Sequence, residues 1–285
     1  MEITVLGSMG QLGQSLMDVS FKYPQHNFLF TDIDTVDIRF SRQIENFVAK
    51  NHPSVLINCA GYTAVEKAQN EVRQAMELNI HAVGNLAKVA AANNIFLVHI
   101  STDYIYDGKQ NRPYKETDNV HPLSVYGRTK WKGEAEMRKS QCKGAVIRTS
   151  WLYSEYGTNF LKTILQLSEE EKELKVVLDQ IGTPTYAHDL AEAIMQVIHQ
   201  KDTIEQMDTF HYSNEGVASW YDFAVEIMRF AKRDNSVIPV SAKLFPSSVK
   251  RPNYSVLDKT KIKETFDITI PHWRDSLERC MKNMA

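Results

Sequence analysis

Tyr126 and Lys130 are the two residues whose types and spacing first indicate chemistry. Residues four positions apart lie on one face of a helix, so the phenol and the ammonium would sit side by side. A phenol titrates near ~10 in water, and a neighbouring cation lowers that pKa because it favours the phenolate. The pair therefore predicts a proton-transfer device suited to carbonyl reduction. The same spacing also occurs by chance on an amphipathic helix, with the tyrosine half-buried and the lysine reaching solvent.

A glycine-rich turn near the N-terminus predicts a phosphate-binding site that could serve this pair. The β-branched run 2–6 leads into the turn, and apolar residues at helical spacing follow it from 14 to 23. Strand, glycine turn and helix in this order are typical of a phosphate cradle, because the backbone can approach a diphosphate there and the helix N-terminus faces its charge. The residues expected to hold a dinucleotide in this turn are Gly7, Met9, Gly10, Gln11, Leu12 and Gly13.

Acidic residues follow the second expected strand. Asp32 stands about as far from the glycine turn as an acidic ribose ligand should, and Asp34 and Asp37 compete for that role. Asp37 and Ile38 could instead line an adenine pocket, and Arg39 could meet a 2′-phosphate. The choice between NAD and NADP therefore stays open, and a solvated acidic loop is an equal alternative.

The third expected strand, 54–61, is apolar and ends in small residues that leave room for a cofactor. Those small residues are Cys59, Ala60 and Gly61. The following helical stretch, 72–93, carries Asn79, whose helix propensity is low and which therefore indicates either a role at the site or plain solvent exposure.

The fourth expected strand, 95–100, runs into Thr102. In a parallel sheet this threonine would emerge at the same edge as the glycine turn, with its hydroxyl available to a bound carbonyl. We therefore take Thr102 as a third candidate catalytic residue beside Tyr126 and Lys130, although a simple turn residue would look the same.

The order of these runs predicts an α/β fold with a Rossmann-like, doubly wound parallel sheet over residues 1–150, including a fifth strand at 145–149. Beyond 150 the alternation is less regular, which indicates a smaller α/β lobe over 151–285, mainly substrate-binding, with some segments returning to the first domain. The expected elements there are helices at 158–167, 189–200, 220–232 and 272–284, short strands at 175–178 and 209–212, a solvated turn at 169–173 and a shaped loop at 179–185.

Composition narrows the partners. The 285 residues carry a formal net charge of -2 without a basic block, so nucleic acid has no electrostatic support. Three widely spaced cysteines form neither a metal motif nor a disulfide framework and favour a reducing compartment. The first residues resemble a buried strand rather than a signal peptide, and no segment is apolar enough to span a bilayer, so we expect a cytoplasmic protein with no membrane partner.

Seven short motifs resemble those of the extended short-chain dehydrogenases/reductases, and more narrowly those of the dTDP-4-dehydrorhamnose reductase family. The glycines and Tyr-x-x-x-Lys mark only the superfamily, whereas Thr102, Trp151 and the two late motifs narrow the resemblance. The matching segments cover nearly the whole chain and are 7–13, 58–67, 101–108, 126–134, 148–153, 179–185 and 251–255.

The resemblance implies NADPH or NADH over the glycine turn, with Asp37 and Ile38 near adenine and Lys130 bonded to the nicotinamide ribose. Tyr126 would protonate the C4 oxygen of dTDP-4-dehydro-6-deoxy-L-mannose, and Thr102 would polarise the same carbonyl, closing the synthesis of dTDP-L-rhamnose for cell-surface polysaccharide. Candidate contacts to this nucleotide-sugar substrate are Thr63, Val65, Tyr104, Tyr106, Trp151 and Arg251, the last as a bidentate grip on an anionic group.

The chain also departs from the family. Some members dimerise through magnesium held by glutamates, one of them just after the Pro-Thr of the late loop, but here 185–189 contains none. We therefore predict no metal, and a monomer or a homodimer. Related readings are a reductase or epimerase for another nucleotide sugar, or a regulatory subunit that binds dinucleotide without turnover. Dehydratases typically have Asp-Glu after the threonine, whereas Asp103-Tyr104 stands here.

Overall fold

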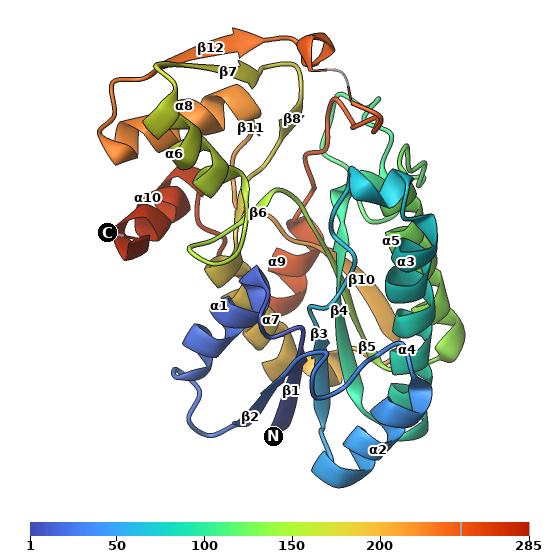
Figure 1. The fold of residues 1–285 in the computed structure, drawn as a ribbon. Helices are drawn as coiled ribbons and strands as arrows, with labels where there is room; N and C mark the ends of the chain where they lie inside the picture. The colour runs from blue at the N-terminus through green and yellow to red at the C-terminus, as the bar shows by residue number, and fades with distance from the viewer. Residues whose placement is uncertain (246, 285) are drawn as a thin grey trace.

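The first lobe is built on a parallel sheet of six strands in the order β10-β5-β4-β3-β1-β2 (Figure 1). The computed structural model describes residues 1–245 and 247–284. The strands are β1 (Glu2–Leu6), β2 (Asn27–Thr31), β3 (Val55–Asn58), β4 (Phe96–Thr102), β5 (Gly144–Thr149) and β10 (Met207–His211). Strand β1 pairs with β2 on one side and β3 on the other, so the strand order reverses beside it. This arrangement confirms the predicted Rossmann-like α/β sheet.

Helices cover both faces of the sheet, so its central strands are buried along almost their whole length. Helices α1 (Gln11–Ser20), α7 (Ala187–His199) and α9 (Thr260–Phe266) share one apolar core with the strands. Helices α2 (Ser41–Asn51), α4 (Ala82–Ala92) and α5 (Val125–Ser140) contribute to another, and α3 (Val72–Met76) lies before α4 in the chain. Both α7 and α9, like β10, come from beyond residue 150, so the chain returns to the first lobe after leaving it.

The second lobe packs three helices against short strand pairs (Figure 1). The helices are α6 (Phe160–Glu170), α8 (Trp220–Ala231) and α10 (Trp273–Met284). The strand pairs are β6 (Leu152–Tyr153) with β9 (Thr185–Tyr186), β7 (Glu173–Val177) with β12 (Ser236–Val240), and β8 (Ile181–Gly182) with β11 (Ala218–Ser219). Within the described residues no helix combines the length and apolarity needed to cross a bilayer.

Several local expectations differ from the structure. The sequence also predicts a helix at 41–50 with Ser41 as its cap. In the structure the N-cap position of α2 is Phe40, and no side chain bonds the free backbone amides there. The charged run 169–173 is divided between the end of α6 and the start of β7, because the apolar residues on either side extend both elements. The loop 179–185 contains β8 and part of β9, and both β12 and α9 lie in stretches whose sequence predicted no element.

Helix α5 is held close to the sheet edge by a tight contact with the helix that precedes β4. The segment 77–81 forms a π-helical turn between α3 and α4, a feature frequent at functional sites. Gly133 of α5 packs on this turn so closely that a Cβ there would lie 2.1 Å from the Asn79 carbonyl oxygen. The absence of a side chain at Gly133 therefore allows α5, which carries Tyr126 and Lys130, to pack this closely on the 77–81 turn.

A buried ion pair ties α5 to the strands behind the site. Glu134 is fully buried, and its carboxylate accepts hydrogen bonds from Arg148 Nη2 at 2.7 Å and Nε at 3.0 Å. Ser101, next to Thr102 on β4, donates to the same carboxylate at 2.5 Å. Arg148 also donates to the Tyr106 hydroxyl at 2.8 Å. The network therefore joins α5, β4 and β5 through groups that water does not reach.

Glu134→Gln should destabilise the fold by about 3–5 kcal/mol, because it leaves the Arg148 guanidinium buried without a counter-charge. Urea unfolding of the wild type and the variant measures this difference. Glu136→Gln is the matched control on the same helix, since its partner Lys139 lies at the surface and loss of that pair should cost less than ~1 kcal/mol. Equal effects of the two substitutions would contradict the assigned role of Glu134.

Candidate active site

A cavity of about 620 Å³ opens where the carboxyl ends of β1, β3, β4 and β5 meet the second lobe. This is the edge at which open α/β sheets bind ligands. The residues predicted from the sequence that line it are Gly7, Gly10, Gln11, Leu12, Gly13, Asp32, Asp37, Ile38, Cys59, Ala60, Gly61, Thr63, Val65, Thr102, Tyr104, Tyr126, Lys130 and Trp151. Met9, Asn79, Tyr106 and Arg251 are not part of this lining.

The glycine turn forms one end of the cavity and fits a diphosphate. Gly7 adopts φ +77°, and a Cβ at this position would lie 2.6 Å from the Ala60 backbone nitrogen, so only glycine is accommodated. The Asp32 carboxylate accepts the Met9 amide at 3.0 Å and the Ile33 amide at 2.8 Å, which braces the turn against β2. The Met9 side chain itself points outward and is 71% exposed.

Asp37 and Arg39 form a local ion pair at the adjoining wall. Arg39 donates from Nε and Nη2 to the Asp37 carboxylate, at 2.9 Å and 2.6 Å respectively. Hydrogen bonding to Arg39 lowers the pKa of Asp37 because it stabilises the charged form. The guanidinium is therefore already bound to Asp37, and a 2′-phosphate would have to share it.

Asn79 supports the cavity from behind. Its Oδ1 accepts the Tyr62 amide at 2.8 Å, and its Nδ2 donates to Thr129 Oγ1 at 3.1 Å. Asn79 is fully buried, which excludes the solvent-exposed alternative. Its side-chain amide joins the loop after β3 to α5. Asn79 therefore supports the loop that carries Gly61.

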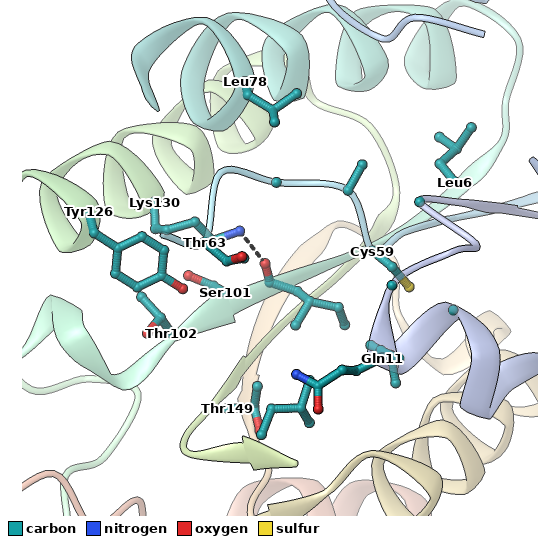
Figure 2. Close-up of a pocket in the computed structure, with 18 of the residues that line it drawn as sticks. Leu6, Gln11, Cys59, Thr63, Leu78, Ser101, Thr102, Tyr126, Lys130 and Thr149 are labelled. Atoms are coloured by element: carbon teal, nitrogen blue, oxygen red, sulfur yellow. Dashed lines mark hydrogen bonds between the residues drawn. The ribbon is translucent and has the colours of Figure 1, made fainter. Parts of the chain in front are cut away.

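The three catalytic candidates meet at the end of β4. Figure 2 shows Tyr126 and Lys130 projecting from one face of α5, with Thr102 close to the phenol. Ser124 caps this helix by accepting the Gly127 amide, which begins the helix just before Tyr126. Lys130 Nζ donates to the Ile100 carbonyl oxygen at 2.5 Å, so the ammonium is anchored to β4 rather than free in the cavity.

The titration of Tyr126 differs from the sequence expectation. Burial raises the pKa of its phenol to about 12, and hydrogen bonding to Thr102 offsets only part of this rise. The expected lowering by Lys130 is absent: loss of water around the phenolate is the largest effect, and the Asp103 carboxylate raises the pKa further. Tyr126 is therefore a protonated acid at neutral pH, the form needed to give a proton to a substrate oxygen.

The pKa of Lys130 shifts in the opposite direction to that of Tyr126. The residue is 4% exposed, and burial lowers the pKa of its ammonium to about 8 although Glu134 and Cys59 oppose the shift. The His99 Nε2 lies 3.4 Å from Nζ on the side away from the cavity. Burial likewise raises the pKa of the Cys59 thiol to about 12, so this thiol is neutral at physiological pH.

Aromatic residues from both lobes form the far wall. Tyr104 packs edge-on against Tyr126, with ring centroids 5.7 Å apart. Trp151, held at φ +46°, stacks on Trp220 of α8 with centroids 3.5 Å apart. Flat apolar faces of this kind suit a sugar ring or a base. The wall is completed only when residues that follow β4 and β5 come together with Trp220 of α8.

Two predicted substrate residues lie elsewhere. Tyr106 is fully buried behind the site, where its hydroxyl contacts Arg148 and His211, because the single 3-10 turn 103–105 points Tyr104 and Tyr106 to different sides. The structure thus corrects the placement of Tyr106 in the cavity. Arg251 faces a neighbouring hollow and pairs with Glu66 at 2.7 Å. Its Nε is buried without a hydrogen-bond partner.

Other lining residues were not identified from the sequence. Asp103 lines the cavity, and burial raises the pKa of its carboxyl to about 6, while hydrogen bonds from Ser255 and Thr102 oppose this. Its place directly after Thr102 could have identified it, as could the place of Ser150 directly after β5. Trp220 lies far along the chain and carries no such signal. Among the described residues, no three His, Cys, Asp or Glu side chains gather as metal ligands.

Comparison with known proteins places the chain in a family. The model of the family described as RmlD substrate binding domain matches residues 1–285. The dTDP-4-dehydrorhamnose reductase of Aggregatibacter actinomycetemcomitans is 36% identical over 290 residues, covering 99% of this chain and 97% of that protein. The spore coat polysaccharide biosynthesis protein SpsK of Bacillus subtilis is 34% identical, covering 100% of this chain and 98% of that protein.

Two solved structures share the fold throughout. A dTDP-4-dehydrorhamnose reductase from Clostridium acetobutylicum superposes with a TM-score of 0.94 at 39% identity and covers 100% of this chain and 99% of its own. The reductase from Bacillus anthracis, solved in complex with NADP, has a TM-score of 0.94 at 34% identity and covers 99% of each chain. These likenesses over the full length show that the chain belongs to the dTDP-4-dehydrorhamnose reductase family.

Proposed function

We propose that this chain reduces the C4 keto group of dTDP-4-dehydro-6-deoxy-L-mannose to dTDP-L-rhamnose with NADPH or NADH, the last step of dTDP-rhamnose biosynthesis. Relatives that match the whole chain carry this activity in their names, and one was solved with NADP. The observation that carries the proposal is that a protonated, buried Tyr126 and a glycine cradle open into one cavity.

The residues divide the reaction between them. When bound, the nicotinamide cofactor supplies the hydride that reduces the carbonyl carbon. Tyr126 gives its phenol proton to the carbonyl oxygen as negative charge develops there, and the Thr102 hydroxyl polarises the same oxygen. Lys130 holds a positive charge beside the phenolate that remains and bonds the nicotinamide ribose. Each group thus interacts more strongly with the transition state than with the free carbonyl.

The rest of the substrate extends toward the second lobe. We assign Thr63, Val65, Tyr104 and Trp151 to the sugar because they line the cavity around Tyr126. We assign Arg251 to the diphosphate. Arg251 lines a hollow of about 740 Å³, its buried Nε has no hydrogen-bond partner, and an anion in the hollow would replace the exposed Glu66 as the partner of Nη2.

The cysteines bear on the compartment in which the protein works. The three cysteines are all unpaired, which fits a reducing compartment, and a cytoplasmic place would supply nucleotide cofactor. A monomer or homodimer that needs no metal ion and binds no nucleic acid is the form we propose.

The direct test follows NADPH and NADH absorbance in turn, with the 4-keto sugar generated from dTDP-glucose by a dehydratase and an epimerase. Oxidation that requires both coupling enzymes would support the proposed reaction. Tight dinucleotide binding without oxidation would instead favour another nucleotide sugar or a regulatory role.

Tyr126→Phe should lower kcat by at least ~100-fold, because it removes the proton donor and nothing else from the cavity. Cofactor affinity should change little, which a fluorescence titration with NADPH measures. Tyr104→Phe is the matched control, since its hydroxyl is not assigned to the proton step. Unchanged turnover in Tyr126→Phe would remove this residue from the mechanism.

The pH profile of kcat/KM should be level near neutrality and fall as pH rises through about 8. The lowered pKa of Lys130 means that its ammonium exists below this value and is lost above it. Tyr126, with a pKa of about 12, stays protonated over the same range and cannot cause this limb. Rates measured from pH 6 to pH 10 test the assignment, and a fall only near pH 10 would contradict it.

A further inference from the structure

His99 packs against Lys130 from behind the cavity. It lies within β4, is fully buried, and brings Nε2 to 3.4 Å from Lys130 Nζ. It does not line the cavity, so neither substrate nor cofactor would touch it. Burying a polar ring in the middle of a central strand costs free energy unless both of its nitrogens have hydrogen-bonding partners.

Asn58 at the end of β3 sets the direction of this ring. Its Oδ1 accepts the Ala60 backbone amide at 3.1 Å, so its amide nitrogen must be the atom that faces His99 Nδ1 at 3.0 Å. An amide nitrogen only donates, and Nδ1 must therefore accept. Burial and the nearby Lys130 lower the pKa of His99 well below its usual value, so the ring is neutral and carries its proton on Nε2.

The Nε2 hydrogen then points at the Lys130 amine. A charged ammonium has only donors and gains no hydrogen bond from this contact, whereas its bond to the Ile100 carbonyl remains available. The other titratable groups that act on Nζ are Glu134 on α5 and Cys59 after β3. Burial raises the pKa of the Cys59 thiol and keeps it neutral at physiological pH, so Glu134 is the charged group of these two that favours the ammonium there.

We propose that His99, oriented by Asn58, is a positioning residue that turns the hydrogens of the Lys130 ammonium toward Ile100 and the cavity. The inference rests on the proposed function only in giving Lys130 a contact with the cofactor. It predicts that changing the ring from donor to acceptor changes how Lys130 titrates.

His99→Gln tests this directly, because the glutamine amide can present an oxygen that accepts from the ammonium. The affinity for NADPH, measured by fluorescence from pH 6 to pH 10 without sugar substrate, should weaken at a midpoint about one pH unit higher than in the wild type. His99→Leu offers no polar atom, so NADPH should bind roughly fivefold more weakly at pH 7, and the glutamine variant should restore most of this loss.

His211→Gln is the matched control. His211 is equally buried in β10 of the same sheet, but its ring contacts the Tyr106 hydroxyl and the Tyr114 carbonyl instead of Lys130. The midpoint in this variant should equal that of the wild type. Thermal unfolding of all variants separates a change in titration from a change in stability.

A second readout keeps the test independent of activity and of cofactor. The rate at which cyanate carbamoylates Lys130, followed by mass spectrometry against pH, reports the same midpoint in the free protein. An upward shift in His99→Gln by both methods supports the inference, even if no sugar is reduced and the proposed function fails. Equal midpoints in the wild type and His99→Gln would overturn it, even if the reductase assay succeeds.

Discussion

The burial of one ammonium group, that of Lys130, is the constraint on which the site depends. A charge that is 4% exposed needs a carboxylate in reach, and Glu134 supplies it one turn further along α5. Glu134 is buried too, so it needs Arg148 and Ser101 in turn. The core behind the sheet edge is therefore polar because the cavity in front of it must hold a cation.

The same burial acts on Tyr126 with the opposite sign. It raises the pKa of the phenol and lowers that of the lysine, so the neutral form of each is favoured. In the resting pair the phenol of Tyr126 is protonated and lies beside a Lys130 ammonium that loses its proton more easily than usual. Lys130 has not already converted the phenol to a phenolate. Charge separates only when the proton leaves for the substrate oxygen, which is the moment at which a neighbouring cation helps most.

The two lobes meet over this pair and are linked by polar contacts at the rim. Arg251 and Ser247 from the second lobe both bind Glu66 on the loop after β3. Trp151 leaves β5 in a left-handed conformation and is stacked on Trp220 of α8. The far wall of the cavity therefore depends on how the lobes dock, while the proton-transfer residues depend only on the first lobe.

Much of the first lobe was predictable because it follows from local patterns. Apolar runs, a glycine turn and the ends of parallel strands place Gly7, Thr102 and Tyr126 at one sheet edge without any knowledge of distant contacts. The second lobe was predicted less well. Its strands are short, and all three of its strand pairs join segments more than 30 residues apart, so their periodicity is too weak to read along the chain.

The sequence by itself determined the residue types of the site, their order and the fold that brings them together. Only the tertiary structure decided how these residues titrate and which ones face the cavity. In the folded chain Tyr106 is buried in the core, Arg251 is paired with Glu66, and Trp220 lines the cavity wall. The physical reason is that burial and long-range contacts set both the pKa values and the directions of side chains, and neither is encoded in the spacing of neighbouring residues.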